Sequence, residues 1–110
     1  MNIVFLRGNL TNDPQLEDVE TSNGTVKVVN FTIAVNRSFN RSDGQRCTGV
    51  DFIPCTIWDS GAISFANMAT KGSSVFIEGI LKSQSWETDD GQRRSKVLVR
   101  VSHFDILNKK

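Results

Sequence analysis

The 110-residue sequence has little of what membrane and secreted proteins need. No apolar run approaches the roughly 18 residues of a membrane span, and the N-terminus lacks the basic start and cleavage site of a signal peptide. The only two cysteines, Cys47 and Cys55, have a spacing that matches neither a disulfide framework nor a metal motif. We therefore expect a cytoplasmic protein with no membrane contact and two free thiols.

Residues that carry catalysis or bind cofactors are equally scarce. The one histidine, His103, has no Cys, Asp or Glu cluster at metal spacing beside it. No glycine loop that would cradle a phosphate is present, and Asp89-Asp90-Gly91 is typical of a turn. We expect no catalytic residue, metal, cofactor or small-molecule substrate. An enzyme of unrecognised type stays an alternative that no residue pattern supports.

Net charge is also small, at +1, which argues against a protein that coats duplex DNA by bulk charge alone. The acids crowd an early segment, and most cations come later. If the fold gathers these cations, they form a basic surface; an ordinary mixed surface is the alternative. The early acids are Asp13, Glu17, Asp18 and Glu20, and the later cations are Arg37, Arg41, Arg46, Lys71, Lys82, Arg93, Arg94, Lys96 and Arg100.

What the sequence does contain is a series of alternating apolar segments separated by turn signals. The predicted strands cover residues 2–9, 26–36, 50–58, 73–86 and 95–107, with a short edge strand over 15–20. A helix is predicted over 60–70, capped by Asp59 or Ser60 and stopped at Gly72. The polar residues 38–49 predict a long hairpin loop.

Three strands, one helix and two strands, in that order, predict an all-β fold with one helix. The arrangement is that of the OB-fold, a five-stranded Greek-key barrel with a helix between strands 3 and 4. The chain length suits one such domain over residues 1–110. A different small β-barrel is the alternative.

Large aromatic side chains fall on the outer face of two predicted strands. The core-facing rows are Ile53, Cys55 and Ile57 in one strand and Val75, Ile77 and Leu81 in the other. Because side chains alternate along a strand, Phe52, Trp58 and Trp86 point outward. Phe39 lies in the polar loop. Trp58 begins the turn into the helix, so we expect it to be the half-buried one.

Exposed aromatic rings reduce solubility unless something covers them. Nucleobases stack on such rings whatever their sequence, at about 1–3 kcal/mol per base, and neighbouring cations match the phosphates. The pattern therefore favours a surface for single-stranded nucleic acid. The alternative is that these rings are buried in the core or in subunit contacts.

Several short motifs follow one another in a specific order and spacing along nearly the whole chain. They include Gly8-Asn9-Leu10, Asp13-Pro14, Ala34-Val35-Asn36-Arg37-Ser38-Phe39, Asp51-Phe52, Trp58, Val75-Phe76-Ile77-Glu78-Gly79 and Trp86. In this order the motifs resemble those of bacterial and phage single-stranded-DNA-binding proteins, the SSB family. The resemblance implies an OB-fold that coats single-stranded DNA during replication, recombination, repair or DNA uptake. It also implies a homotetramer, with a dimer as the alternative.

The resemblance assigns roles to eight residues. It implies that bases stack on Phe39, Phe52, Trp58 and Trp86. Phosphate contact falls on Lys71, Lys82 and Arg94, and on Arg41 in a hairpin where a basic residue is common. We also expect Arg37, two residues before Phe39, to contact phosphate.

Departures from the family pattern reduce the expected ionic contacts. Gln84-Ser85, Asp59-Ser60 and Ile53-Pro54 stand where many members carry basic residues, and Arg7 stands at a position that is usually apolar. We therefore expect fewer phosphate contacts than a typical member makes. The chain also ends in the basic Asn108-Lys109-Lys110, where many members continue into an acidic tail. It thus resembles either a natural short form or a protein whose tail has been removed.

Two further alternatives remain open. One is an OB-fold protein-interaction module, such as a dimeric primosomal accessory protein, whose outer aromatics are buried at a subunit or partner face. The other is RNA as the ligand, because stacking alone does not sense the 2′-hydroxyl.

Overall fold

The computed structural model describes residues 1–107, which form six strands and one helix. The elements are β1 (Val4–Leu10), β2 (Gln15–Thr21), β3 (Gly24–Asn40), β4 (Arg46–Trp58), α1 (Ser60–Met68), β5 (Ser74–Glu87) and β6 (Arg93–Ile106). The expectation about the basic chain end concerns residues 108–110, which lie outside the described residues.

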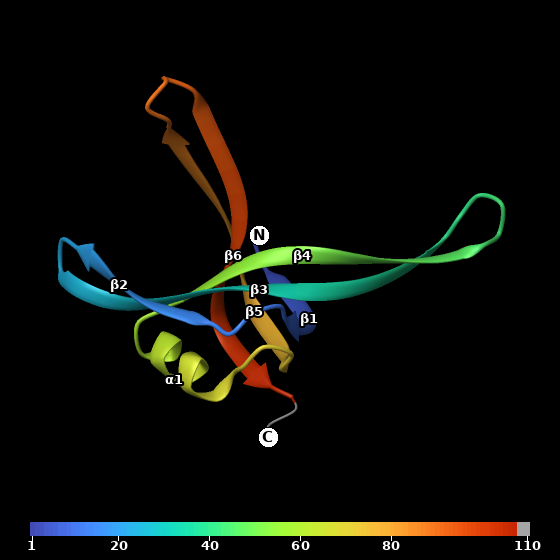
Figure 1. Cartoon of the computed structure of the whole chain (residues 1–110), viewed down its shortest axis with the longest axis horizontal. Helices are drawn as coiled ribbons and strands as arrows, with labels where there is room; N and C mark the ends of the chain where they lie inside the picture. Colours follow the sequence, from blue (N-terminus) through green and yellow to red (C-terminus); the bar gives the residue numbers. More distant parts are fainter. Residues whose placement is uncertain (108–110) are drawn as a thin grey trace.

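Five of the strands close into a barrel (Figure 1). They follow one another as β1-β5-β6-β4-β3, and Asn9 and Leu10 of β1 pair with β3 to complete the ring. The pairing of β4 with β6 is parallel, and the other strand pairs are antiparallel. Strand β2 extends β3 as the predicted edge strand. The predicted OB-fold, with its helix between the third and fourth barrel strands, is confirmed.

The core is built from alternate residues of the strands and from one face of α1. Ile33 and Ile77 are fully buried, as is Phe65 of the helix. The Phe65 ring stacks on Phe31 with 4.4 Å between ring centroids, and it meets Phe104 edge-on at 5.0 Å. The helix therefore holds one end of the barrel closed through a single aromatic cluster.

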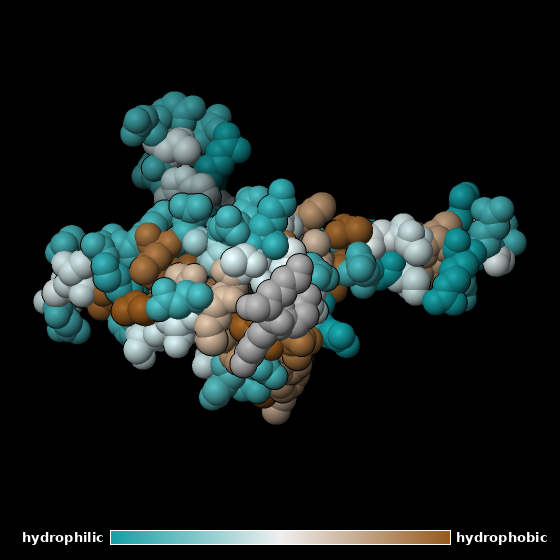
Figure 2. Space-filling model, turned by 60° about the horizontal axis from the view of Figure 1, so that its bottom comes forward, coloured by the Kyte–Doolittle hydropathy of each residue, from teal (hydrophilic) through white to brown (hydrophobic). Residues whose placement is uncertain are grey.

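Three hairpins extend beyond the barrel (Figure 1), and in Figure 2 the hairpin tips are hydrophilic while apolar surface gathers nearer the barrel. In the β3–β4 arm the strands stay paired out to Asn40 and Arg46. The loop predicted over residues 38–49 is therefore wrong, because only residues 41–45 form the turn. No buried face imposes an apolar alternation on this arm, so its polar sequence hid the pairing.

The β5–β6 arm explains why Leu81, predicted to face inward, is 49% exposed. A bulge between Glu78 and Gly79 shifts the register of β5 against β6, and beyond it the two strands leave the barrel as an arm. Leu81 is therefore exposed just past the bulge, although its partner on β6, Val99, is still buried in the core.

The predicted helix start is correct in position, because Asp59 is the N-cap residue of α1, although its side chain makes no capping hydrogen bond. The predicted stop at Gly72 is wrong, because α1 ends at Met68. Gly72, with φ of 89°, lies in the turn that follows the helix, where its left-handed conformation costs a glycine little.

Candidate nucleic-acid interface

A groove lies on the outer face of the barrel where the base of the β5–β6 arm meets β3 and β4. Trp58 is opposite Val28 and Thr56 is opposite Asn30, so the even-numbered residues of β3 and β4 share this face. The groove holds two adjoining hollows of about 280 and 220 Å³.

The two hollows share part of their lining. Asn30, Lys96 and Leu98 line both of them. Trp58 and Gln84 line the larger hollow only. Pro54 and the corner between β1 and β2 border the smaller one. Leu98, 7% exposed, is buried although it lies on the outer face of β6, so it contributes an apolar floor.

Three of the four predicted stacking rings lie on the groove side. Phe52 shares the outer face of β4 with Trp58 and is 65% exposed. Trp58 is half-buried, as expected from its place before the helix. Trp86 is 46% exposed and lies on the same face of the β5–β6 arm as Gln84, directly opposite Arg94.

Arg100 and Lys96 are interface residues that the sequence analysis did not select. The Arg100 guanidinium lies over the Trp58 ring, 5.0 Å from its centroid, a cation–π contact. Lys96 is opposite Gln84 and lines the groove. The signal was present in the sequence, because Arg94, Lys96 and Arg100 alternate along one face of a single strand.

Phe39 lies on the other face of the β3–β4 arm. It is opposite Cys47, and its odd number places it on the reverse side from Phe52. Arg37 lies over its ring at 5.1 Å and pairs with Asp51 at 3.1 Å between Nε and Oδ1. Register therefore does not bring Phe39 onto the groove face, and Arg37 is already partly neutralised.

The residues predicted to contact phosphate lie in different parts of the fold. Lys82 and Arg94 lie on the groove face of the β5–β6 arm, opposite Leu98 and Trp86. Lys71 lies in the turn before β5, where its backbone N–H donates to the Asp13 carboxylate at 2.7 Å. Asp13 lines the smaller hollow, so Lys71 flanks it.

Arg41 stands apart from these cations, in the turn at the tip of the β3–β4 arm. Among the described residues, Lys82, Arg94, Lys96 and Arg100 form no ion pair with an acid. These four cations are therefore available to an anionic ligand.

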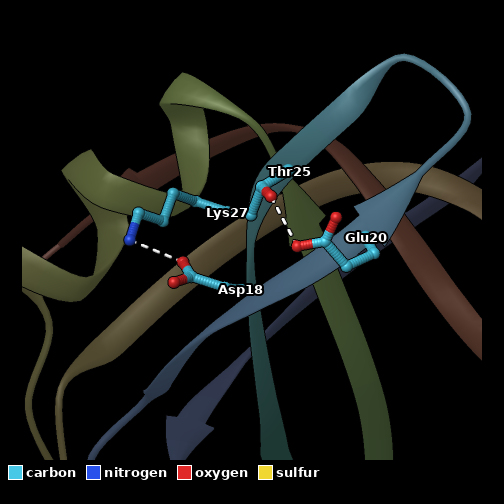
Figure 3. Close-up of polar contacts among 4 residues, drawn as sticks. All are labelled: Asp18, Glu20, Thr25 and Lys27. Atoms are coloured by element: carbon cyan, nitrogen blue, oxygen red, sulfur yellow. Dashed lines mark hydrogen bonds and ion pairs between the residues drawn. The ribbon is translucent and has the colours of Figure 1, made fainter.

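Two carboxylates of the early acidic segment have partners within the β2–β3 hairpin, and one of these partners is a cation (Figure 3). Lys27 pairs with Asp18 at 2.5 Å, and the Thr25 hydroxyl donates to Glu20 at 2.6 Å. Glu17 lies opposite Val28, on the groove face. The positive strip along the β5–β6 arm therefore gives way to negative charge at β2.

Two classes of feature are absent from the part of the chain that the structure describes. No group of three or more His, Cys, Asp or Glu side chains within residues 1–107 is arranged to hold a metal ion. The helix that these residues form, α1, is not long and apolar enough to cross a membrane.

The chain resembles known proteins over its whole described length. The model of the Single-strand binding protein family matches residues 1–107. A single-stranded DNA-binding protein of Lactiplantibacillus plantarum is 41% identical over 107 residues, which cover 97% of this chain and 51% of that protein. Single-stranded DNA-binding protein 1 of Streptococcus pyogenes is 37% identical over 110 residues, covering all of this chain and 81% of that one. The chain thus spans about half the length of the first of these relatives.

Two solved structures have the same fold. A deletion mutant of the single-stranded DNA binding protein from Thermus aquaticus gives a TM-score of 0.85 at 28% identity, covering 98% of this chain and 51% of that one. The Plasmodium falciparum SSB complex with ssDNA gives 0.86 at 21% identity, covering 98% and 96%. The second likeness supports the fold alone.

Proposed function

The chain belongs to the single-strand binding protein family, and from this we propose that it binds and coats single-stranded DNA with little sequence preference. The observation that carries the proposal is the groove itself, flanked by Phe52, Trp58 and Trp86. Unpaired cations line the same face. Aromatic rings and cations together are what a flexible strand of bases and phosphates needs.

Stacking supplies the part of binding that ignores base identity, because every base has a flat face. Strand β4 fixes Phe52 and Trp58 six residues apart, roughly 20 Å along an extended strand. Arg100 holds the Trp58 ring and adds charge beside it. Phe39, Arg37 and Arg41 would form a second contact for a strand that wraps around the β3–β4 arm.

We propose binding rather than catalysis, in the cytoplasm, during replication, recombination, repair or DNA uptake. The relatives are bacterial proteins named for single-stranded DNA binding. Their family is generally non-enzymatic. No metal or cofactor is needed for stacking and charge neutralisation to hold a strand.

A homotetramer is proposed as the working form, with a dimer as the alternative. One edge of β1 pairs with β5, whereas its other edge pairs only at Asn9 and Leu10 within the described residues. An unpaired strand edge readily adds a strand from another copy. Phe5, 60% exposed, and Phe76 also stack on the outer face of this sheet at 6.2 Å, which supports a subunit contact.

The test of DNA binding is tryptophan fluorescence titrated with oligo(dT), since both tryptophans border the groove. Strong quenching at low salt is expected, and its absence would refute the proposal. Light scattering on the same sample gives the oligomeric state. If Trp86→Ala dissociates the oligomer but leaves DNA binding unchanged, Trp86 belongs to a subunit contact, as in the interaction-module alternative.

A further inference from the structure

Four side chains form a square on the outer face of β1 and β5. The pairing of the two strands places Arg7 opposite Phe76 and Phe5 opposite Glu78, and residues two apart on a strand share a face. The two rings occupy one diagonal of the square, stacked with 6.2 Å between their centroids. Arg7 and Glu78 occupy the other diagonal. The square therefore has an aromatic centre, one positive corner and one negative corner.

The two charged corners do not neutralise each other within one copy of the chain. Arg7 forms no ion pair with any acid of residues 1–107, and the stacked rings lie between it and Glu78. The Glu78 carboxylate pairs instead with the imidazole of His103, its neighbour on β6, at 3.4 Å between Oε2 and Nδ1. Arg7 therefore keeps its full charge beside exposed aromatic rings.

This pattern of rings and charges is complementary to itself. A two-fold axis along the line through both rings turns a second copy face to face with the first. It sets the aromatic centres against each other and brings each Arg7 over Glu78 of the other copy, so one contact holds two ion pairs. An axis along the other diagonal would set Arg7 against Arg7, and repulsion between like charges disfavours it.

We propose that this square is a self-recognition surface for a second copy of the chain, with Arg7 of each copy paired to Glu78 of the other. The inference rests on the homo-oligomer proposed above and assigns the residues that select the partner. Phe5 and Phe76, 60% and 37% exposed, supply apolar area to the contact. The charges fix the orientation, because a charge buried without a partner is strongly unfavourable. A partner must therefore carry an acid and a cation on the same diagonal.

Charge-reversal variants test the pairing between copies. Arg7→Glu sets two carboxylates against each other at each corner, and Glu78→Arg sets two guanidinium groups there, so each variant alone should dissociate at this contact. We expect its dissociation constant to rise roughly 30-fold or more, the loss for breaking one buried charge pair, as measured by sedimentation velocity over a range of protein concentrations. An equimolar mixture of the two variants has opposite charges at both corners again, so mixing should restore the assembly.

Asp105→Arg is the matched control. Asp105 lies opposite Phe76 on β6, beside the square but outside it. Its reversal changes the net charge by the same amount as Glu78→Arg, yet it should leave the assembly intact. Far-UV circular dichroism verifies that all three variants fold.

Four results would overturn the inference: an unmodified protein that is monomeric, a single variant that keeps the unmodified assembly, a mixture that stays dissociated, or equal dissociation by Asp105→Arg. Tryptophan quenching by a short oligo(dT) is read on the same samples. No residue of the square lines either hollow of the groove, so quenching should survive dissociation. Its absence from the unmodified protein would refute the proposed DNA binding without bearing on the assembly.

Discussion

A substitution at Phe52 tests DNA binding with little effect on folding stability. Its side chain is 65% exposed on the outer face of β4, so the substitution Phe52→Ala removes little buried area and should leave the melting temperature nearly unchanged. If one base stacks on this ring, the loss is about 1–3 kcal/mol. At tenfold per 1.4 kcal/mol, that is about a 5- to 150-fold weaker Kd.

The assay is anisotropy of a labelled oligo(dT), repeated at several salt concentrations. Because Phe52 carries no charge, the slope of log K against log salt should be the same as in the unmodified protein. Ile63→Ala is the matched control, since Ile63 is an exposed apolar residue of α1, 42% exposed and outside the lining of either hollow. An affinity within twofold of the unmodified protein would refute the stacking role. So would a loss accompanied by a lower melting temperature, because it would show that the ring supports the fold.

Three other predictions address the core, the arm and the thiols. Phe65→Ala should lower the unfolding free energy by about 3–5 kcal/mol, because Phe65 is fully buried in the aromatic cluster; a urea midpoint near that of the unmodified protein would contradict this. Asp51→Asn releases Arg37 from its ion pair, so oligo(dT) should bind more tightly and with a steeper salt dependence. The slope of log K against log salt should steepen by up to roughly 0.7 for one added phosphate contact. An unchanged slope would exclude Arg37 as a phosphate ligand. Burial raises the pKa of the Cys55 thiol from its ordinary 9.0 to about 12, so iodoacetamide at pH 8.5 should label Cys47 alone, as mass spectrometry would show. The same shift stabilises the fold below pH 9.0, and this contribution is lost as pH rises from 9.0 towards 12; a urea midpoint that stays flat over this range in the unmodified protein would contradict it.

The barrel was predictable because its strands have one buried face. Ile53, Cys55 and Ile57 alternate with outward residues, and the interior side of that alternation matches the structure. The arms were less predictable, because neither face of an arm is buried and alternation carries no signal there. Leu81 shows this limit, since it continues the apolar alternation of Val75 and Ile77 but is exposed just past the bulge at Glu78 and Gly79.

The interface was predictable residue by residue but not as a surface. Strand parity correctly placed Phe52 and Trp86 outside. It could not show that Phe39 lies on the reverse of the β3–β4 arm, because the predicted loop had no register at all. Nor could it show that Arg37 already has Asp51 as a partner, since the pairing of β3 with β4 brings them together.

The arms have a consequence for how the molecule opens. Its radius of gyration is 16.2 Å, against about 13 Å for a compact domain of 100 residues, because two long hairpins stand away from the barrel. Their backbone hydrogen bonds are complete, yet almost no apolar surface is buried beneath them. Amide protons in the arms should therefore exchange with solvent through local opening, at a lower free energy than those of the barrel. A ligand held between arm and barrel would slow that exchange, so the protection of arm amides reports occupancy without any label on the DNA.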